Sequence, residues 1–127
     1  MARYEHLPVF KKAMELSVYM EQIVRNFSRY HKYGIGCELR EQARRIIGLI
    51  IQANSCEDKT PMLRDLATAC EQMKMLVILA KEIKAFQSFK SFQHAAGLAT
   101  SLCRQSEGWH ASSKKGRNHP PRTSVGR

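Results

Sequence analysis

The chain has 127 residues, with 21 Lys and Arg against 11 Asp and Glu, so its formal net charge at pH 7 is +10. This length suits a single domain with its own core. The longest apolar stretches, such as 46–51 and 75–80, are far shorter than the ~20 residues of a membrane span, and the first residues lack the apolar run of a signal peptide. We therefore expect a cytoplasmic protein without a membrane segment, and the charge favours an anionic partner, most commonly nucleic acid.

Apolar residues recur along the chain at alternating steps of four and three, which is typical of one helical face. The first predicted helix begins near Pro8, because the first helical turn tolerates proline. Gly34 and Gly36 are expected to end it and to open a turn. Its apolar stripe consists of Val9, Ala13, Leu16, Met20, Ile23, Phe27 and Tyr30.

Two further helices follow the same pattern. The second has apolar positions Leu39, Ala43, Ile46, Ile50 and Ala53, and a polar loop follows at 54–58. Thr60 and Pro61 predict the start of the third helix, as a capping threonine before a proline at the first helical position. The stripe of that helix is Leu63, Leu66, Cys70, Met73, Leu76, Val77, Ala80 and Ile83.

Ser88 is expected to cap a fourth helix that ends around His110. Its stripe is Phe92, Ala96, Ala99, Cys103 and Ser106, with Leu102 and Trp109 beside it. No segment has the alternating pattern of a strand. The sequence therefore predicts an all-α fold, an up-down-up-down four-helix bundle whose helices have about 20 residues each, over residues 1–110.

The composition changes at Ala111. Residues 111–127 contain five basic residues, no acidic residue and one bulky apolar residue, Val125, so we expect a disordered basic tail. This tail carries half of the net charge and leaves +5 on the residues before it. It is either a phosphate-binding arm or a solubilising end.

The charges of residues 1–110 have two interpretations. Arg25, Arg29 and Lys32 either stabilise the end of the first helix or form a basic cap. In the second helix, Arg40 and Arg44 fall in line with two isoleucines, about 100° around the helix from its core stripe. Apolar residues that lie off the core stripes indicate either a subunit interface or a wide core stripe; they are Ile47, Ile51, Met75, Ile78 and Leu79.

Signals of catalysis and metal binding are missing from the sequence. There is no glycine-rich phosphate loop, no histidine-carboxylate ligand spacing and no nucleophile motif. The four cysteines, Cys37, Cys56, Cys70 and Cys103, are widely spaced and are expected to be reduced thiols. We therefore expect no enzyme activity, no metal site and no cofactor.

Five short blocks of the sequence, taken together, resemble one known family. They are 3–8 (RYEHLP), 26–33 (NFSRYHKY), 80–86 (AKEIKAF), 91–95 (SFQHA) and 104–109 (RQSEGW). They resemble the accessory variability determinant proteins of diversity-generating retroelements, which are relatives of the four-helix bundle proteins encoded in ribosomal-RNA intervening sequences. The likeness covers roughly residues 3–110. It departs from the family at 34–37, where a less flexible turn is expected, and at His110, where an apolar residue is more usual.

The resemblance implies a non-catalytic basic bundle that assembles into a homopentamer, partners a reverse transcriptase and binds nucleic acid, either RNA or DNA. Such proteins support mutagenic retrohoming, in which an error-prone cDNA of a template repeat replaces a variable repeat in a target gene. Two alternatives stay open: a stand-alone RNA-binding bundle of the intervening-sequence type, and a purely structural oligomer whose charge serves solubility.

No short motif of the family defines a site, so the candidate contacts with nucleic acid or polymerase are the basic residues of the body. They are Arg25, Arg29, Lys32, Arg40, Arg44, Lys74, Lys81 and Lys84. The candidate oligomer interface consists of the five off-stripe apolar residues named above. A closed ring repeats each cation once per subunit, so a surplus of five charges becomes a dense basic surface.

Overall fold

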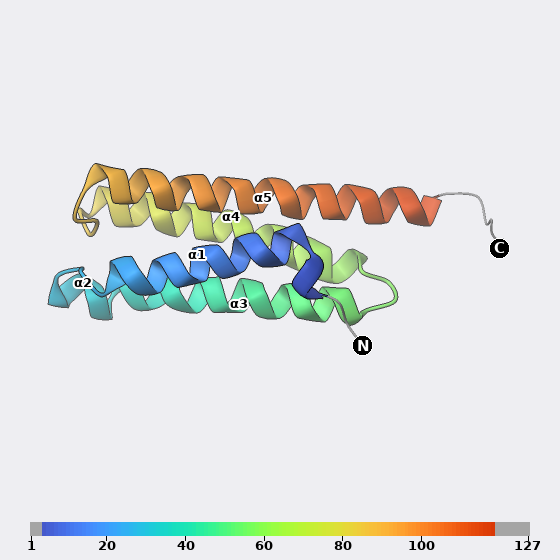
Figure 1. Ribbon diagram of the computed structural model, residues 1–127, viewed down its shortest axis with the longest axis horizontal. Helices are drawn as coiled ribbons and strands as arrows, with labels where there is room; N and C mark the ends of the chain where they lie inside the picture. The colour runs from blue at the N-terminus through green and yellow to red at the C-terminus, as the bar shows by residue number, and fades with distance from the viewer. Residues whose placement is uncertain (1–3, 119–127) are drawn as a thin grey trace.

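The computed structural model describes residues 4–118, and within that range every regular element is a helix. Four long helices lie side by side in an elongated bundle, and a short helix, α2, lies at one end of it (Figure 1). The elements are the 3₁₀ helix η1 (Tyr4–His6) and the α-helices α1 (Pro8–Val24), α2 (Arg29–Tyr33), α3 (Ile35–Ser55), α4 (Thr60–Glu82) and α5 (Phe89–Asn118). The predicted all-α four-helix bundle is confirmed.

Consecutive long helices run in opposite directions, as predicted for an up-down-up-down bundle (Figure 1). Helix α1 packs against α3 and α5, and α4 packs against the same two helices. This closed circuit places α1 and α4 at diagonally opposite corners. Surfaces on the α1–α3 side and on the α4–α5 side of the bundle are therefore separate.

The core contains most of the predicted stripe residues of the first three long helices, together with residues of α5. Each large side chain that is fully buried there contributes about 1.5–3 kcal/mol of hydrophobic stabilisation. The largest fully buried apolar side chains are Leu16, Met20, Leu39, Ile46, Ile50, Leu63, Leu66, Met73, Val77 and Leu102. Ile83, which was predicted on the third stripe, is instead 39% exposed, because it lies just past the end of α4.

The buried face of α5 differs from its predicted stripe. Ala95 and Leu98 are buried, whereas Phe92 and Ala96 are only half-buried. Because α5 packs against both α1 and α4, it buries a wider face than a single row of residues provides.

The first predicted helix is broken in the structure. Helix α1 ends at Val24, and α2 begins at Arg29 after a turn. Ser28 caps α2, because its Oγ accepts a hydrogen bond from the backbone N–H of His31 at 3.4 Å. Phe27 still reaches the core, but Tyr30, which the periodicity placed on the core stripe, is 83% exposed. The apolar spacing thus continues across a break that Asn26 and Ser28 favour, since both residue types prefer caps and turns to helix interiors.

Gly36 lies inside the first turn of α3 rather than in a turn between helices. A Cβ atom at this position would lie 2.7 Å from Val24 Cγ1 and 2.9 Å from the His31 carbonyl oxygen. Helix α3 therefore begins in direct contact with both the end of α1 and the backbone of α2. Only glycine lacks the atom that would push these segments apart.

The other helix starts largely follow the sequence prediction. Ser88 caps α5, since its Oγ accepts a hydrogen bond from the Ser91 N–H at 3.1 Å. Thr60 is not the helix cap that the sequence predicted: α4 begins at Thr60 itself, one residue before Pro61, and Lys59 holds the cap position without a side-chain hydrogen bond. The Thr60 N–H donates to Asp58 Oδ1 at 3.2 Å. Proline therefore lies in the first turn, where its missing N–H costs no helical hydrogen bond.

Helix α5 is longer than predicted. It continues beyond His110 to Asn118, so the first part of the predicted disordered tail is helical. Ala111, Lys114 and Lys115 favour a helix, and the first proline after Trp109 is Pro120; Gly116 weakens the helix by only about 1 kcal/mol, far less than a proline would. The remaining part of the predicted tail, 119–127, lies outside the described residues.

The contact at Gly36 leads to a stability prediction. Gly36→Ala should lower the free energy of unfolding by about 1–3 kcal/mol, because the new methyl group overlaps Val24 and a backbone oxygen that cannot easily move. Gly48→Ala is the matched control on the same helix, since a Cβ there meets no atom within 4 Å. It should raise stability by about 0.5–1 kcal/mol. Urea unfolding of both variants measures the difference, and equal effects would contradict the close approach.

Candidate nucleic-acid interface

Glu21, on α1, joins two arginines of α3. Its Oε1 accepts a hydrogen bond from Arg40 Nε at 3.1 Å, and its Oε2 accepts one from Arg44 Nη2 at 2.6 Å. The two arginines are four residues apart and so project from one face of α3. Their side chains stay 34% and 59% exposed, so the ion pairs orient the guanidinium groups without removing them from solvent.

Two more cations lie beside this bridge. Arg25 and Lys32 line a hollow of about 200 Å³ together with Glu21, Val24 and Arg40. Arg25 follows the last residue of α1, and Lys32 comes from α2, which the turn at 25–28 folds back toward α3. We name the group Arg25, Lys32, Arg40 and Arg44 the basic edge. With Glu21 as its central carboxylate, it has a formal surplus of three positive charges.

The predicted cations on α4 do not join the basic edge. Lys74 Nζ lies 3.6 Å from Glu71 Oε1, and Lys81 Nζ lies 3.5 Å from Glu82 Oε2. Lys81 Nζ also lies 5.3 Å from the centre of the Phe92 ring on α5. These contacts hold Lys81 toward α5, on the other side of the bundle. The structure therefore splits the eight predicted contact residues into separate groups.

Lys84 has a structural role of its own. It adopts a positive φ of 63°, and the residues around it form a Schellman end to α4: the Ala85 N–H donates to the Ala80 carbonyl at 2.8 Å, and the Lys84 N–H donates to the Lys81 carbonyl at 3.0 Å. The left-handed backbone is unfavourable for a residue with a Cβ. Lys84 thus ends the helix in a position that usually carries glycine.

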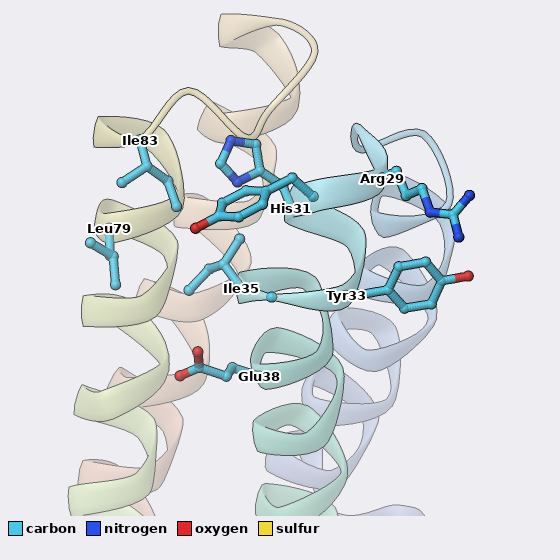
Figure 2. A pocket seen from close by; sticks show the side chains of 9 residues that line it. Arg29, His31, Tyr33, Ile35, Glu38, Leu79 and Ile83 are labelled. Carbon is cyan, nitrogen blue, oxygen red and sulfur yellow. The ribbon is translucent and has the colours of Figure 1, made fainter.

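A larger hollow, of about 700 Å³, lies beside α2 (Figure 2). We name it the α2 hollow. It includes Arg29 from the predicted set and two tyrosines, Tyr30 and Tyr33, which are 83% and 70% exposed. Its lining is Arg29, Tyr30, His31, Tyr33, Gly34, Ile35, Glu38, Leu79 and Ile83. Sequence reasoning overlooked these tyrosines as surface residues, although the run RYHKY, which mixes aromatic and basic residues, carries the signal.

The predicted oligomer interface also separates into two parts. Met75, Ile78 and Leu79 are exposed, and Ile83 continues the same row by three-four spacing. We name these four residues the α4 ridge. Ile51 is half-buried, and Ile47 is half-buried against the core. The ridge is the stronger candidate for a subunit contact, and the role of both parts in assembly stays a prediction.

Cys70 and Cys103 are buried neighbours between α4 and α5. The hydrogen bond to Cys103 and the burial of the site raise the pKa of the Cys70 thiol. Cys70 is therefore a neutral, unreactive thiol of the core.

Residues 4–118 contain neither a metal-binding cluster nor a membrane-spanning helix. No three His, Cys, Asp or Glu side chains in this range are grouped so that they would hold a metal ion. None of the helices in the same range has the length and apolarity that crossing a membrane requires. The features left to explain are the basic edge, the α2 hollow and the α4 ridge.

Neither a protein-family model nor a curated protein matches this chain. The resemblance to retroelement accessory proteins therefore rests on the five sequence blocks. Two of these blocks, 26–33 and 80–86, contain residues that line the α2 hollow.

The backbone at Lys84 leads to a second stability prediction. Lys84→Gly should raise the free energy of unfolding by about 0.5–1 kcal/mol, because glycine removes the cost of the left-handed conformation and keeps the Schellman hydrogen bonds. Lys74→Gly is the matched control on the same helix and should lower stability by about 1 kcal/mol. Thermal and urea unfolding measure both changes. A destabilised Lys84→Gly variant would show that the side chain contributes more than the backbone conformation costs.

Proposed function

We propose that this chain is a non-catalytic accessory protein that binds the phosphates of nucleic acid along the basic edge. In that role it holds template RNA or its cDNA to a reverse transcriptase of a diversity-generating retroelement during mutagenic retrohoming. The observation that carries the nucleic-acid part is the surplus of positive charge fixed around Glu21. The retroelement part rests on the sequence resemblance.

Helix dipoles alone do not account for the basic edge. Cations near a helix C-terminus interact favourably with its dipole, which explains Arg25 after α1 and Lys32 in the last turn of α2. Arg40 and Arg44, however, lie in the first half of α3, where a cation gains nothing from the dipole. Arg25 and Lys32, which stabilise helix ends, and Arg40 and Arg44, which do not, thus lie together on one surface. Glu21 balances one of these four charges, and an anionic partner accounts for the surplus of three that is left.

The proposed binding is electrostatic and only weakly sequence-specific. Arginine and lysine contacts to phosphate fix the position of a strand but carry no base information. In a homo-oligomer, the surplus of three charges at each basic edge recurs in every subunit, so the binding surface is larger than one chain provides.

Salt dependence tests the phosphate contacts. Four contacts to a single strand predict that log K falls with log salt at a slope of about −3, since each contact contributes about 0.7. Affinity for RNA should then drop about 50-fold between about 50 and 200 mM salt. Fluorescence anisotropy with a labelled oligonucleotide measures this slope. Affinity that stays constant over the range would rule out the phosphate model.

Charge removal at matched sites locates the interface. Arg25→Gln with Lys32→Gln should weaken the salt slope by about 1.4, because two phosphate contacts are lost. Lys74→Gln with Lys81→Gln removes the same charge from the other side of the bundle and should leave the slope unchanged. Equal effects of the two pairs would mean that total charge, and not the basic edge, governs binding.

Assembly through the α4 ridge is a separate prediction. Ile78→Glu with Leu79→Glu should reduce the particle mass measured by multi-angle light scattering, because carboxylates would be buried in an apolar contact. Gln93→Glu with Arg104→Glu places charges on exposed positions of α5 and serves as the control. An unchanged mass in the first variant would exclude the ridge as a subunit contact.

The partner distinguishes the leading proposal from its alternatives. Co-purification with a reverse transcriptase encoded beside this chain, dependent on template RNA, favours the retroelement role. A stand-alone bundle of the intervening-sequence type would bind RNA without that enzyme. A purely structural oligomer would bind neither.

A further inference from the structure

Helix α2 carries two aromatic rings that are unusually exposed to solvent. Tyr30 and Tyr33 are 83% and 70% exposed, although a tyrosine ring is normally packed along much of its surface. The Tyr30 ring forms a T-shaped pair with the His31 ring, with 5.3 Å between the two ring centres. Neither ring is needed to fill the core, which is closed below α2 by Phe27 and Ile35. The two rings are therefore available to a ligand.

We propose that α2 is a stacking platform for unpaired bases, so that the ligand of this end of the bundle is a single-stranded nucleic acid. The inference rests on the proposed function and names its ligand more closely. Phosphate contacts alone bind single strands and duplexes alike. Aromatic side chains add affinity for strands whose base faces are free.

The cations around the tyrosines suit this ligand. Within the five residues of α2, the cations Arg29 and Lys32 are interspersed with the two tyrosines. Arg29 and Tyr33 are four residues apart, and Figure 2 shows their side chains on the same side of α2, pointing away from Leu79 and Ile83. Lys32 belongs to the basic edge. A strand whose phosphates lie on the basic edge would reach Lys32 and so approach α2, the helix that carries both exposed rings.

The α2 hollow itself fits an uncharged base better than a phosphate. Ile35 from α3, Leu79 from α4 and Ile83, which directly follows α4, give it an apolar lining (Figure 2). The Glu38 carboxylate also borders it, and a carboxylate repels phosphate but accepts hydrogen bonds from base amino groups. These charges favour a strand whose phosphates lie on the basic edge and whose base lies in the α2 hollow.

The geometry disfavours a duplex as the preferred ligand. In a duplex the flat faces of the bases are covered by neighbouring pairs, so exposed tyrosines reach them only at the ends of the helix. Single-stranded loops and ends leave those faces free to stack on aromatic rings. Selectivity for single strands should therefore come from the tyrosines, and the overall salt dependence from the basic edge.

The test compares ring-removing and ring-keeping variants of the full chain. Tyr30→Leu with Tyr33→Leu keeps an apolar side chain but removes both rings, whereas Tyr30→Phe with Tyr33→Phe keeps the rings. Affinities are measured for a single strand of about 12 nucleotides and for a blunt duplex of the same length. Circular dichroism and thermal unfolding confirm that each variant is folded, which the exposure of both side chains leads us to expect.

The leucine pair should bind the single strand at least about 25-fold more weakly than the natural chain, since each stacked base contributes about fivefold or more. Its duplex affinity should change less than about threefold, its salt slope should stay the same, and the phenylalanine pair should bind like the natural chain. The inference is wrong if the leucine pair keeps its single-strand affinity, and a simultaneous change in particle mass would assign the tyrosines to a protein contact. Failure of the natural chain to bind either ligand at low salt would overturn the proposed function as well.

Discussion

The close approach of α3 to the α1–α2 junction determines most of what this end of the bundle presents. Because Gly36 has no side chain, the first turn of α3 lies against Val24 and the backbone of His31. This contact holds α2 across the end of the bundle instead of letting the first helix run on. Lys32 is thereby placed beside Arg25 and Arg40, and Tyr30 and Tyr33 are turned to the surface. A single missing Cβ thus underlies both the basic edge and the α2 hollow.

The charges matter by arrangement more than by number. Lys74 and Lys81 have carboxylates of their own helix close by, and such exposed pairs contribute only about 0–1 kcal/mol. Glu21 instead serves two arginines at once, so the group around it keeps a positive surplus while its geometry is restrained. Restrained cations lose less side-chain entropy when they bind phosphate, and this favours the basic edge over the lysines of α4 as a binding surface.

Apolar periodicity predicted the fold well because burial on one face is the dominant constraint on each long helix. Leu16, Ile46 and Leu66 fell on predicted stripes and are fully buried. The same rule failed at Tyr30, since the spacing of apolar residues does not reveal the helix break at 25–28, where Ser28 caps α2. It also underestimated α5, which packs against two helices, and it placed the end of that helix too early because a polar, basic composition was taken for disorder.

The candidate site was less accessible from sequence. The four-residue spacing of Arg40 and Arg44 placed them on one face of α3, but nothing local indicated that Glu21 would lie between them. That contact depends on how α1 and α3 are aligned along the bundle. In the same way, Arg29 and Lys32 were grouped by their nearness in sequence, whereas the structure divides them between the α2 hollow and the basic edge.

The α4 ridge links subunit assembly to nucleic-acid binding, because it shares residues with the α2 hollow. Leu79 and Ile83 belong both to the ridge and to the lining of the α2 hollow, while the basic edge lies on the α1–α3 side of the bundle. A subunit that covers the ridge would therefore border the hollow and leave the basic edge open. In such an assembly, a base in the hollow of one subunit lies near the next subunit, and its phosphates remain on the first. Binding of a strand and association of subunits would then stabilise each other, because a neighbouring subunit would border the base site and a bound base would lie near that subunit.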